Sequence, residues 1–310
     1  MDDIFTSTIL IVTVASGIRL ATPFLLASLG EALGQRSGVL NLGVDGVMLL
    51  GAFGAYYAVL KTGNLLFGIW VGVFIGALVG IFYAFITVNL NAQQGVSGIG
   101  IYLFGLGMSD LLFQKLVGTP RPILPFPTLE IPLLSNLPVI GEMFFEHSLI
   151  VYIAFLLVPV ATFVMNRTTY GMNVRAIGEN PEAADSLGVS VAAVRYSTLI
   201  IGNSLAGLAG AALSIELGIF QQNLTNAMGF IAIALVYFGA WRPLGVMTGS
   251  LVFGLIASIV LQCKTLGLIP RSASDLAAMA PAIITILALV VVANRFRQPT
   301  ALTKPYIRGD

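Results

Sequence analysis

Charged side chains are scarce in this chain. Of its 310 residues, 9% are charged and 57% are hydrophobic, and the net charge is +1. Soluble domains carry roughly 25% charged residues, so this composition cannot cover a water-exposed surface. The near-zero net charge also gives no basic field, which argues against nucleic acid as a partner.

Cysteine and histidine, which form disulfides and many metal and catalytic sites, are also nearly absent. The chain has one cysteine, Cys263, and one histidine, His147. A single cysteine cannot close an intrachain disulfide, and no second histidine is present to build a metal site. No serine stands beside a suitable base, as an intramembrane hydrolase would require. We therefore expect no catalytic residues, no metal site and no cofactor in this chain.

Long hydrophobic runs make up most of the sequence. Each covers about 20 residues, which at ~1.5 Å per residue crosses the ~30 Å hydrocarbon core of a bilayer. This pattern predicts an all-α polytopic membrane helical bundle, a single transmembrane domain over residues 1–310 with about nine helices (8–10). The predicted spans are Thr6–Leu29, Gly38–Leu60, Leu65–Val88, Val96–Leu116, Ser148–Met165, Ala192–Ile215, Ala227–Trp241, Leu244–Gln262 and Leu276–Asn294.

The distribution of Lys and Arg predicts the orientation. Nine spans put the two termini on opposite sides of the membrane, and cytoplasmic connections carry the excess of Lys and Arg. The set of connections that includes residues 166–191 and the C-terminal tail has nine such residues, and the other set has five. We expect the C-terminus in the cytoplasm and the N-terminus outside. The nine are Arg36, Arg167, Arg175, Arg195, Arg242, Arg295, Arg297, Lys304 and Arg308; the five are Lys61, Lys115, Arg121, Lys264 and Arg271.

The connection of residues 117–147 then lies outside the cell. Its prolines have a fixed φ and no N–H, which predicts a stiff, non-helical extracellular loop. His147, at the membrane edge of this loop, is interpreted as an interfacial residue. The prolines are Pro120, Pro122, Pro125, Pro127, Pro132 and Pro138.

The cytoplasmic loop of residues 166–191 contains the signals of one short helix. Asn180 is a suitable N-cap, Pro181 suits the first helical position, Glu182 complements the helix dipole, and Gly188 suits a left-handed stop. These signals predict a helix over Pro181–Leu187, which is too short to be stable in water by itself. It must dock either on this protein's own cytoplasmic face or on a separate subunit. The chain has no G-x-x-x-x-G-K-[S/T] phosphate loop, so any ATP-driven movement requires another polypeptide.

Three sequence segments resemble a known family. The segment GMNVRAIGENPEAADSLGV, from Gly171, resembles the coupling loop of ABC importer permeases of the branched-chain amino acid and ribose type. RLATPFLLASLG, from Arg19, and RSGVLNLGVDGVMLLGAF, from Arg36, are similar to the smaller permease of nucleoside (basic membrane lipoprotein) uptake systems. Asp45 stands where the family pattern leads us to expect Glu. Further matches are Asn91, Gln94, Val96, Ser97, Gly98, the run Gly229–Val236 and Pro243–Gly245.

The resemblance implies a type II ABC importer-like permease domain in the bacterial cytoplasmic (inner) membrane. It implies a second homologous permease, a cytoplasmic ABC ATPase with two fused nucleotide-binding domains that binds ATP and Mg, and an extracellular lipid-anchored solute-binding protein. The implied cargo is a nucleoside or nucleobase; a sugar, riboflavin or another heterocycle is the alternative. The residues that would couple to the ATPase are Arg175, Gly178, Asn180, Pro181, Glu182, Ala183, Ala184 and Gly188.

Ionisable residues in the membrane need a partner, water or the bundle interior. Arg19 is interpreted as a structural charge that pairs with an acid such as Asp45, with direct solute contact as the alternative. Asp110 and Glu216 lie near the external ends of their spans, where interfacial solvation explains them. In a different class of protein, an ion-coupled secondary carrier, Asp45 would be the titrating group.

The second span contains two polar residues, Asn41 and Asp45, one helical turn apart among several glycines. The glycines are consistent either with close helix packing or with a helix broken near Asn41–Gly46 that lines a polar path. Outside the seventh span, the amide-rich segment 221–226 is either an ordinary loop or a vestibule where Phe220 or Phe230 stacks on a planar solute. The predicted substrate pathway comprises Asn41, Asp45, Ser97, Asn223 and Phe230.

Overall fold

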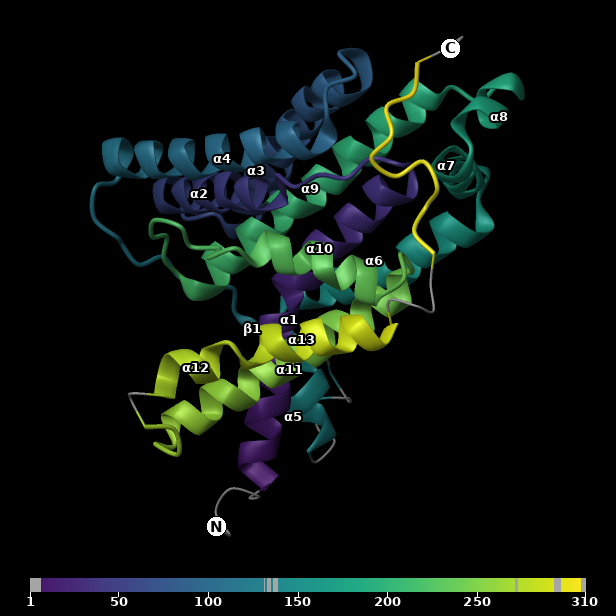
Figure 1. The fold of residues 1–310 in the computed structure, drawn as a ribbon. Coiled ribbons are helices and arrows are strands. Elements are labelled where there is room, and N and C mark those ends of the chain that lie inside the picture. The colour runs from purple at the N-terminus through teal and green to yellow at the C-terminus, as the bar shows by residue number, and fades with distance from the viewer. Residues whose placement is uncertain are drawn as a thin grey trace.

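Helices form almost all of the regular structure (Figure 1). The computed structural model describes residues 7–130, 132, 135, 139–270, 273–292 and 297–307. Within these residues, seven helices are long and apolar enough to cross a membrane, which confirms the predicted polytopic helical bundle. They are α1 (Ser7–Arg36), α2 (Val44–Thr62), α3 (Leu65–Ala84) continued by the π-helix η2 (Phe85–Asn89), α4 (Gln94–Leu116), α6 (Leu149–Arg167), α9 (Val191–Leu217) and α11 (Pro243–Thr265).

The other two predicted spans form shorter helices, α10 (Met228–Phe238) and α13 (Ala280–Val292). With 11 and 13 residues, they are about 16–20 Å long, less than the ~30 Å hydrocarbon core. α10 ends early because Ala240 and Trp241 adopt positive φ, and the indole of Trp241 donates to Gln35 Oε1 at 2.7 Å. The remaining short helices are α5 (Ile140–Phe144), α7 (Thr169–Glu179), α8 (Pro181–Ser186) and α12 (Ser274–Ala278).

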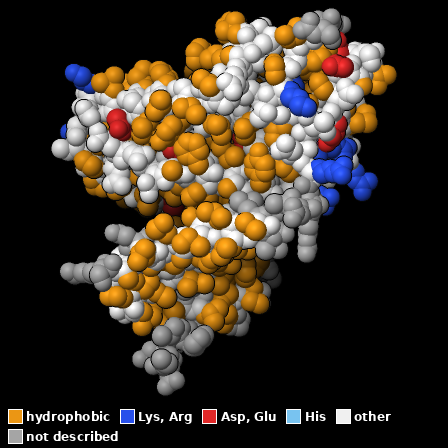
Figure 2. Space-filling model, in the orientation of Figure 1, with side chains coloured by type: hydrophobic (Ala, Val, Ile, Leu, Met, Phe, Trp, Pro, Cys, Tyr) orange, Lys and Arg blue, Asp and Glu red, His pale blue; other side chains and the backbone are white. Residues whose placement is uncertain are grey.

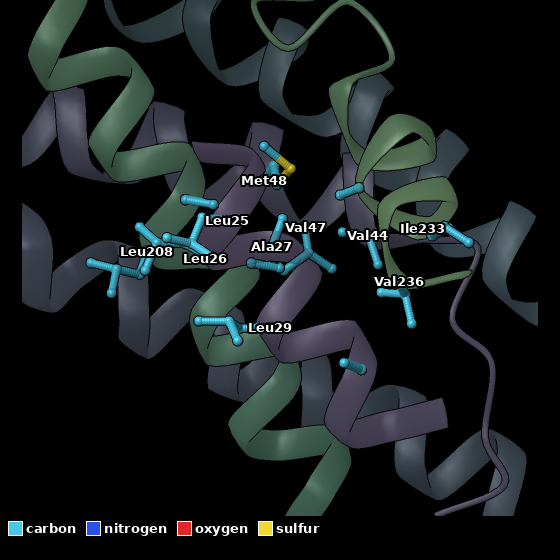
Figure 3. Packing of buried hydrophobic residues seen from close by; sticks show 14 of the residues in the cluster. Leu25, Leu26, Ala27, Leu29, Val44, Val47, Met48, Leu208, Ile233 and Val236 are labelled. Carbon is cyan, nitrogen blue, oxygen red and sulfur yellow. The ribbon is translucent and has the colours of Figure 1, made fainter. Parts of the chain in front are cut away.

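Helices α2 and α9 are the interior helices of the bundle. In their most apolar stretches 83% and 78% of the residues are buried, compared with 22% for the span formed by α3 and η2. Figure 3 shows the packed side chains contributed by α1, α2, α9 and α10. This arrangement surrounds the second predicted span with protein, so its polar residues meet other side chains and not lipid.

Small residues bring α2, α3 and α9 close together. A Cβ at Gly76 of α3 would collide with the carbonyl of Asn203, and one at Gly207 of α9 with the carbonyl of Gly72. In α2, a Cβ at Gly51 would likewise meet the carbonyl of Gly207, at 2.5 Å. Close packing through small residues is therefore the role of this glycine in the second span.

The outer faces of the bundle are apolar. Trp70 is 71% exposed, Phe74 61% and Leu156 64%, on α3 and α6. Figure 2 shows hydrophobic side chains over most of one face and a group of Lys and Arg at the right-hand edge, near the end that holds α7 and α8. An apolar surface with charged residues at one edge is suited to contact with lipid. The protein is therefore an integral membrane protein.

Strands β1 (Thr128–Glu130) and β2 (Glu146–Ser148) pair antiparallel and join the two sides of the Pro-rich connection. The same connection is anchored where Ile123 N donates to Gly218 O at 2.8 Å and the Tyr56 hydroxyl to Arg121 O at 2.7 Å. The described part of the loop is thus tied to the ends of α2 and α9. Of the residues used for the sequence predictions, Thr6, Pro138, Arg271, Asn294, Arg295 and Arg308 lie outside the described residues.

Candidate functional site

The short capped helix forms where the sequence predicts it. Asn180 Oδ1 accepts a hydrogen bond from Ala183 N at 3.0 Å, and Pro181 occupies the first turn of α8. Gly188 has φ +85°, the left-handed conformation that favours glycine. The helix ends at Ser186, one residue earlier than predicted. Local capping signals were enough to place this element.

One face of α8 docks on this chain and the other is exposed. Ala184 is 4% exposed and packs with Val174 and Ile177 of α7. On the outer side, Leu187 is 84% exposed. Glu182, Ala183 and Ser186 are also exposed. Contacts with α7 therefore stabilise one side of α8. The opposite side is exposed and includes one large apolar side chain, that of Leu187.

The C-terminal tail also holds this region, which the sequence analysis did not anticipate. The Tyr306 hydroxyl donates to Asp185 Oδ2 at 3.0 Å, and Ala301 N donates to Gly178 O at 2.9 Å. Thr303 N reaches Gly38 O at 3.2 Å, in the connection between α1 and α2. Figure 1 shows the tail, in yellow, running beside α7. The tail thus joins the helix pair α7 and α8 to the α1–α2 connection.

Of the other predicted coupling residues, Arg175 and Gly178 lie on α7. Arg175 Nε donates to Gly171 O at 3.3 Å, and its side chain lines a cavity of about 680 Å³ together with Arg36 and Arg242. Gly178 contacts the Arg36 carbonyl so closely that a Cβ there would collide with it. The last residue of α1 and helix α7 are therefore in direct contact.

The helix break predicted near Asn41–Gly46 does not interrupt the second helix, because α2 is continuous from Val44, and residues 37–43 form the break between α1 and α2. This backbone is buried and non-helical, and side chains from other helices complete its hydrogen bonds. Leu40 N donates to Gln94 Oε1 at 2.9 Å, and Asn41 N to Glu31 Oε1 at 3.0 Å. Arg195 Nε donates to Ser37 O at 3.2 Å. Buried irregular backbone is tolerated here because protein groups satisfy its hydrogen bonds.

Asn41 itself is 1% exposed. Its Nδ2 donates to Asn203 Oδ1 at 2.8 Å, and its Oδ1 accepts from Gly43 N at 2.8 Å. Both ends of the amide are therefore bonded to protein groups. The structure places Asn41 as a residue that holds the break between α1 and α2.

Asp45 is fully buried and holds the start of α10. Its Oδ1 accepts from Gly229 N at 2.7 Å and its Oδ2 from the Thr225 hydroxyl at 3.0 Å. The pair predicted between Arg19 and Asp45 is not formed, because Arg19 is exposed and donates to Ser16 Oγ at 3.2 Å. A carboxylate beside the first N–H groups of a helix is stabilised by the helix dipole, which explains its position.

The remaining predicted pathway residues are more accessible. Ser97 donates to the Gln93 carbonyl of its own helix at 2.9 Å, and Asn223 is exposed with φ +52°. Phe230 is 36% exposed and meets the edge of Tyr102 with ring centroids 5.2 Å apart. Phe220, the other stacking candidate, is fully buried, so it cannot stack on a solute. Asp45 and Phe230 lie close together, because Asp45 accepts a hydrogen bond from the backbone N–H of Gly229, the residue before Phe230. Ser97 and Asn223 lie on other elements.

His147 is 2% exposed and lies buried at the end of the Pro-rich connection, not at an open interface. Its Nε2 donates to Met143 O at 3.0 Å, and its backbone N donates to the Tyr152 hydroxyl at 3.1 Å. Burial lowers the pKa of the imidazole from 6.5, the Met143 carbonyl opposes this shift, and the positive charge of Arg19 adds to it. The ring is therefore neutral at pH 7.

Sequence reasoning missed the residues that hold the break. Glu31 is 5% exposed, and its Oε1 accepts from Gln35 Nε2 at 2.9 Å as well as from Asn41 N. The Tyr83 hydroxyl donates to the Leu40 carbonyl at 2.6 Å. The signal available was an acidic residue, Glu31, four residues before Gln35 in an otherwise apolar helix, which indicates a buried polar network.

Comparison with known proteins identifies the family. A family model described as the permease component of branched-chain amino acid transport systems matches residues 13–293. The nucleoside ABC transporter permease protein NupC of Lactococcus lactis is 33% identical over 96% of this chain and 97% of its own length. The guanosine ABC transporter permease protein NupQ of Bacillus subtilis is 32% identical over 97% and 98%. The putative glucose ABC transporter permease protein TsgC13 of Haloferax volcanii is 39% identical over 81% and 77%.

Each of these three organisms also has a second permease that matches this chain at lower identity, between 23% and 27%. No solved structure matches the chain significantly. The family match confirms the resemblance seen in the sequence, and it favours a subunit of an ABC transporter over an ion-coupled carrier. This chain therefore belongs to the permease family of branched-chain amino acid transport systems, and it is a membrane transport subunit, not an enzyme.

Proposed function

We propose that this chain is the smaller permease of an ATP-driven nucleoside importer in the bacterial cytoplasmic membrane. One observation carries the proposal: α8 is a capped helix whose outer face, with Leu187 84% exposed, is left open at one end of the molecule. A helix of six residues is too short to be stable in water by itself, so its exposed face is suited to a protein partner. A cytoplasmic ABC ATPase, with ATP and Mg bound to it, is the partner we infer.

The orientation follows from the Lys and Arg excess together with the position of the tail. The C-terminal residues 297–307 lie against α7 and α8, at the far end from the start of α1 (Figure 1). We place this end in the cytoplasm, since cytoplasmic connections carry the larger share of Lys and Arg. The Pro-rich loop of residues 117–147 then faces outward, where a lipid-anchored solute-binding protein would dock.

A second homologous permease completes the membrane part. Its support is the pairing of permeases in the three organisms named above, where one member of each pair matches this chain better than the other. The outward apolar faces of α3, α4 and α6 provide surface for it and for lipid. Two permeases moving against each other around a shared path would provide alternating access.

The contacts among α8, the C-terminal tail and α7 suggest how movement of α8 is transmitted. Displacement of α8 acts on the tail through the Tyr306–Asp185 hydrogen bond. The tail contacts Gly38, and α7 contacts Arg36, so both routes reach the break between α1 and α2. Because this break precedes the most buried helix, α2, a small shift there would be transmitted into the centre of the bundle.

The cargo is inferred from the relatives that match over nearly full length, which are named for nucleosides and guanosine. The relative named for glucose has higher identity over a smaller part of the chain, and it makes a hexose the second candidate.

The test is uptake by the complete complex in liposomes. The permease pair, the ATPase and the binding protein are reconstituted, and labelled guanosine, uridine and glucose are offered with ATP inside or outside. We expect guanosine and uridine to accumulate only when ATP reaches the ATPase. Accumulation of glucose alone would select the second candidate, and uptake by this chain alone under an ion gradient would contradict the proposal.

A further inference from the structure

A cavity of about 250 Å³ opens near the end of the bundle opposite α8. Its walls come from the middle of α1, the first turn of α6, the last turns of α9, and parts of α10 and α11. Among the side chains that line it are those of Arg19, Pro23, Ile150, Val151, Glu216 and Met228.

Two opposite charges line this cavity, and each has free hydrogen-bonding capacity. Arg19 is exposed, and Nη2 donates to Ser16 Oγ at 3.2 Å. A guanidinium carries five N–H groups, so most of its donors are uncommitted. Oxygen Oε2 of Glu216 is buried, and within the described part of the chain it has no hydrogen-bond partner. A buried carboxylate oxygen without a partner is costly, so a ligand group that bonded to Glu216 would remove this cost.

A third polar group at the cavity comes from the backbone. Pro23 stands inside α1 and has no N–H, so the carbonyl of Arg19, four residues earlier, cannot make its regular helical hydrogen bond. Both residues line the cavity. The sequence R-L-A-T-P therefore places a carbonyl that lacks its regular helical partner beside the Arg19 side chain.

Most of the remaining wall is apolar, with Ile150, Val151 and Met228 among its members. A neutral solute with hydrogen-bond donors and acceptors at its rim and an apolar ring face would satisfy all of these groups. Guanidinium N–H groups pair with ring acceptors, and a carboxylate accepts from hydroxyl or amino groups. Cavities of this kind, apolar with a few converging polar groups, are typical of small-molecule sites.

We propose that this cavity is the first solute-binding site of the permease, with Arg19 and Glu216 as its recognition residues and a nucleoside as its ligand. The inference rests on the proposed function. It replaces Asn41 and Asp45 as direct contacts, because their polar atoms are bonded to protein groups. It also gives Arg19 the solute contact that the sequence left open as an alternative.

The test uses the complete complex in liposomes with saturating guanosine-loaded binding protein. Glu216→Gln keeps the size of the side chain and removes its charge, and we expect the maximal uptake rate to fall about tenfold or more. Asp110→Asn is the matched control, because Asp110 Oδ1 is also buried without a partner but lies outside this cavity. We expect its uptake to stay within about twofold of the unsubstituted complex.

A second measurement does not depend on charge substitutions. With Cys263→Ser as background, Met228→Cys places a thiol in the cavity wall, and alkylation of that thiol is timed with and without guanosine. We expect guanosine to slow the labelling.

Equal uptake by the Glu216→Gln and Asp110→Asn complexes would overturn the inference, as would alkylation at the same rate with and without solute. Both results leave the proposed function intact, provided that the unsubstituted complex imports guanosine with ATP. Absence of import by the unsubstituted complex would instead contradict the proposed function itself.

Discussion

Leu187 provides the sharpest test of the inferred coupling surface. Leu187 directly follows α8 as its C-cap residue and its side chain is 84% exposed, so the permease itself gains almost nothing from it, and Leu187→Ala should change the stability of the permease by less than about 0.5 kcal/mol. If the ATPase buries the side chain, three carbon atoms leave its interface. At ~0.8 kcal/mol per buried CH₂ this is about 2 kcal/mol, which weakens binding about 30-fold.

The chain supplies a matched control. Leu124 is also 84% exposed, but it lies in the Pro-rich connection at the other end. The dissociation constant of the ATPase is measured on the purified permease pair carrying Leu187→Ala or Leu124→Ala, alongside the unsubstituted pair. We expect a loss of affinity for Leu187→Ala alone. Equal affinities for all three pairs would refute the assignment of α8 as the ATPase-binding helix.

Three further predictions follow from contacts in the structure. Asp45→Ala should destabilise the permease by about 3 kcal/mol, since it leaves a helix N-terminus and a buried hydroxyl unpaired; thermal unfolding of the purified chain measures this, and an unchanged melting temperature contradicts it. Tyr306→Phe removes one hydrogen bond to Asp185, worth about 1 kcal/mol, so amide exchange in α8 should become faster by roughly fivefold while exchange in α2 stays constant. His147 has a folded-state pKa below its unfolded value of 6.5. Its stabilising effect is therefore complete above pH 6.5 and is lost as the pH falls through the folded-state pKa. The Pro-rich connection should therefore become easier to cleave by protease as the pH falls. His147→Gln should weaken this pH dependence of the cleavage rate.

The sequence alone predicted the features that depend on neighbouring residues. Runs of apolar residues located the helices because crossing a bilayer requires only length and hydrophobicity. The ends of α8 were predicted because Asn180 and Gly188 act on backbone groups a few residues away. The family was recognisable because its motifs are continuous segments, and the match over residues 13–293 confirmed it.

The roles of the polar residues could not be predicted in this way. Asp45 was a candidate for the solute path, but its partner Gly229 lies 184 residues later in the chain. The end of α10 depends on the hydrogen bond from Trp241 to Gln35, across 206 residues. Periodicity shows which face of a helix a residue occupies and does not show which distant backbone reaches it.

Composition, segment length and local capping thus determined that this protein is a membrane-embedded helical bundle with a short capped helix in the loop of residues 166–191. The tertiary structure alone decided which polar groups are already bonded and which are free. Asn41 and Asp45 are bonded to protein partners, whereas Glu216 lines a cavity and its buried Oε2 has no hydrogen-bond partner among the described residues. The physical reason is that a hydrogen bond is satisfied by proximity in space, and proximity between helices far apart in sequence is set by packing.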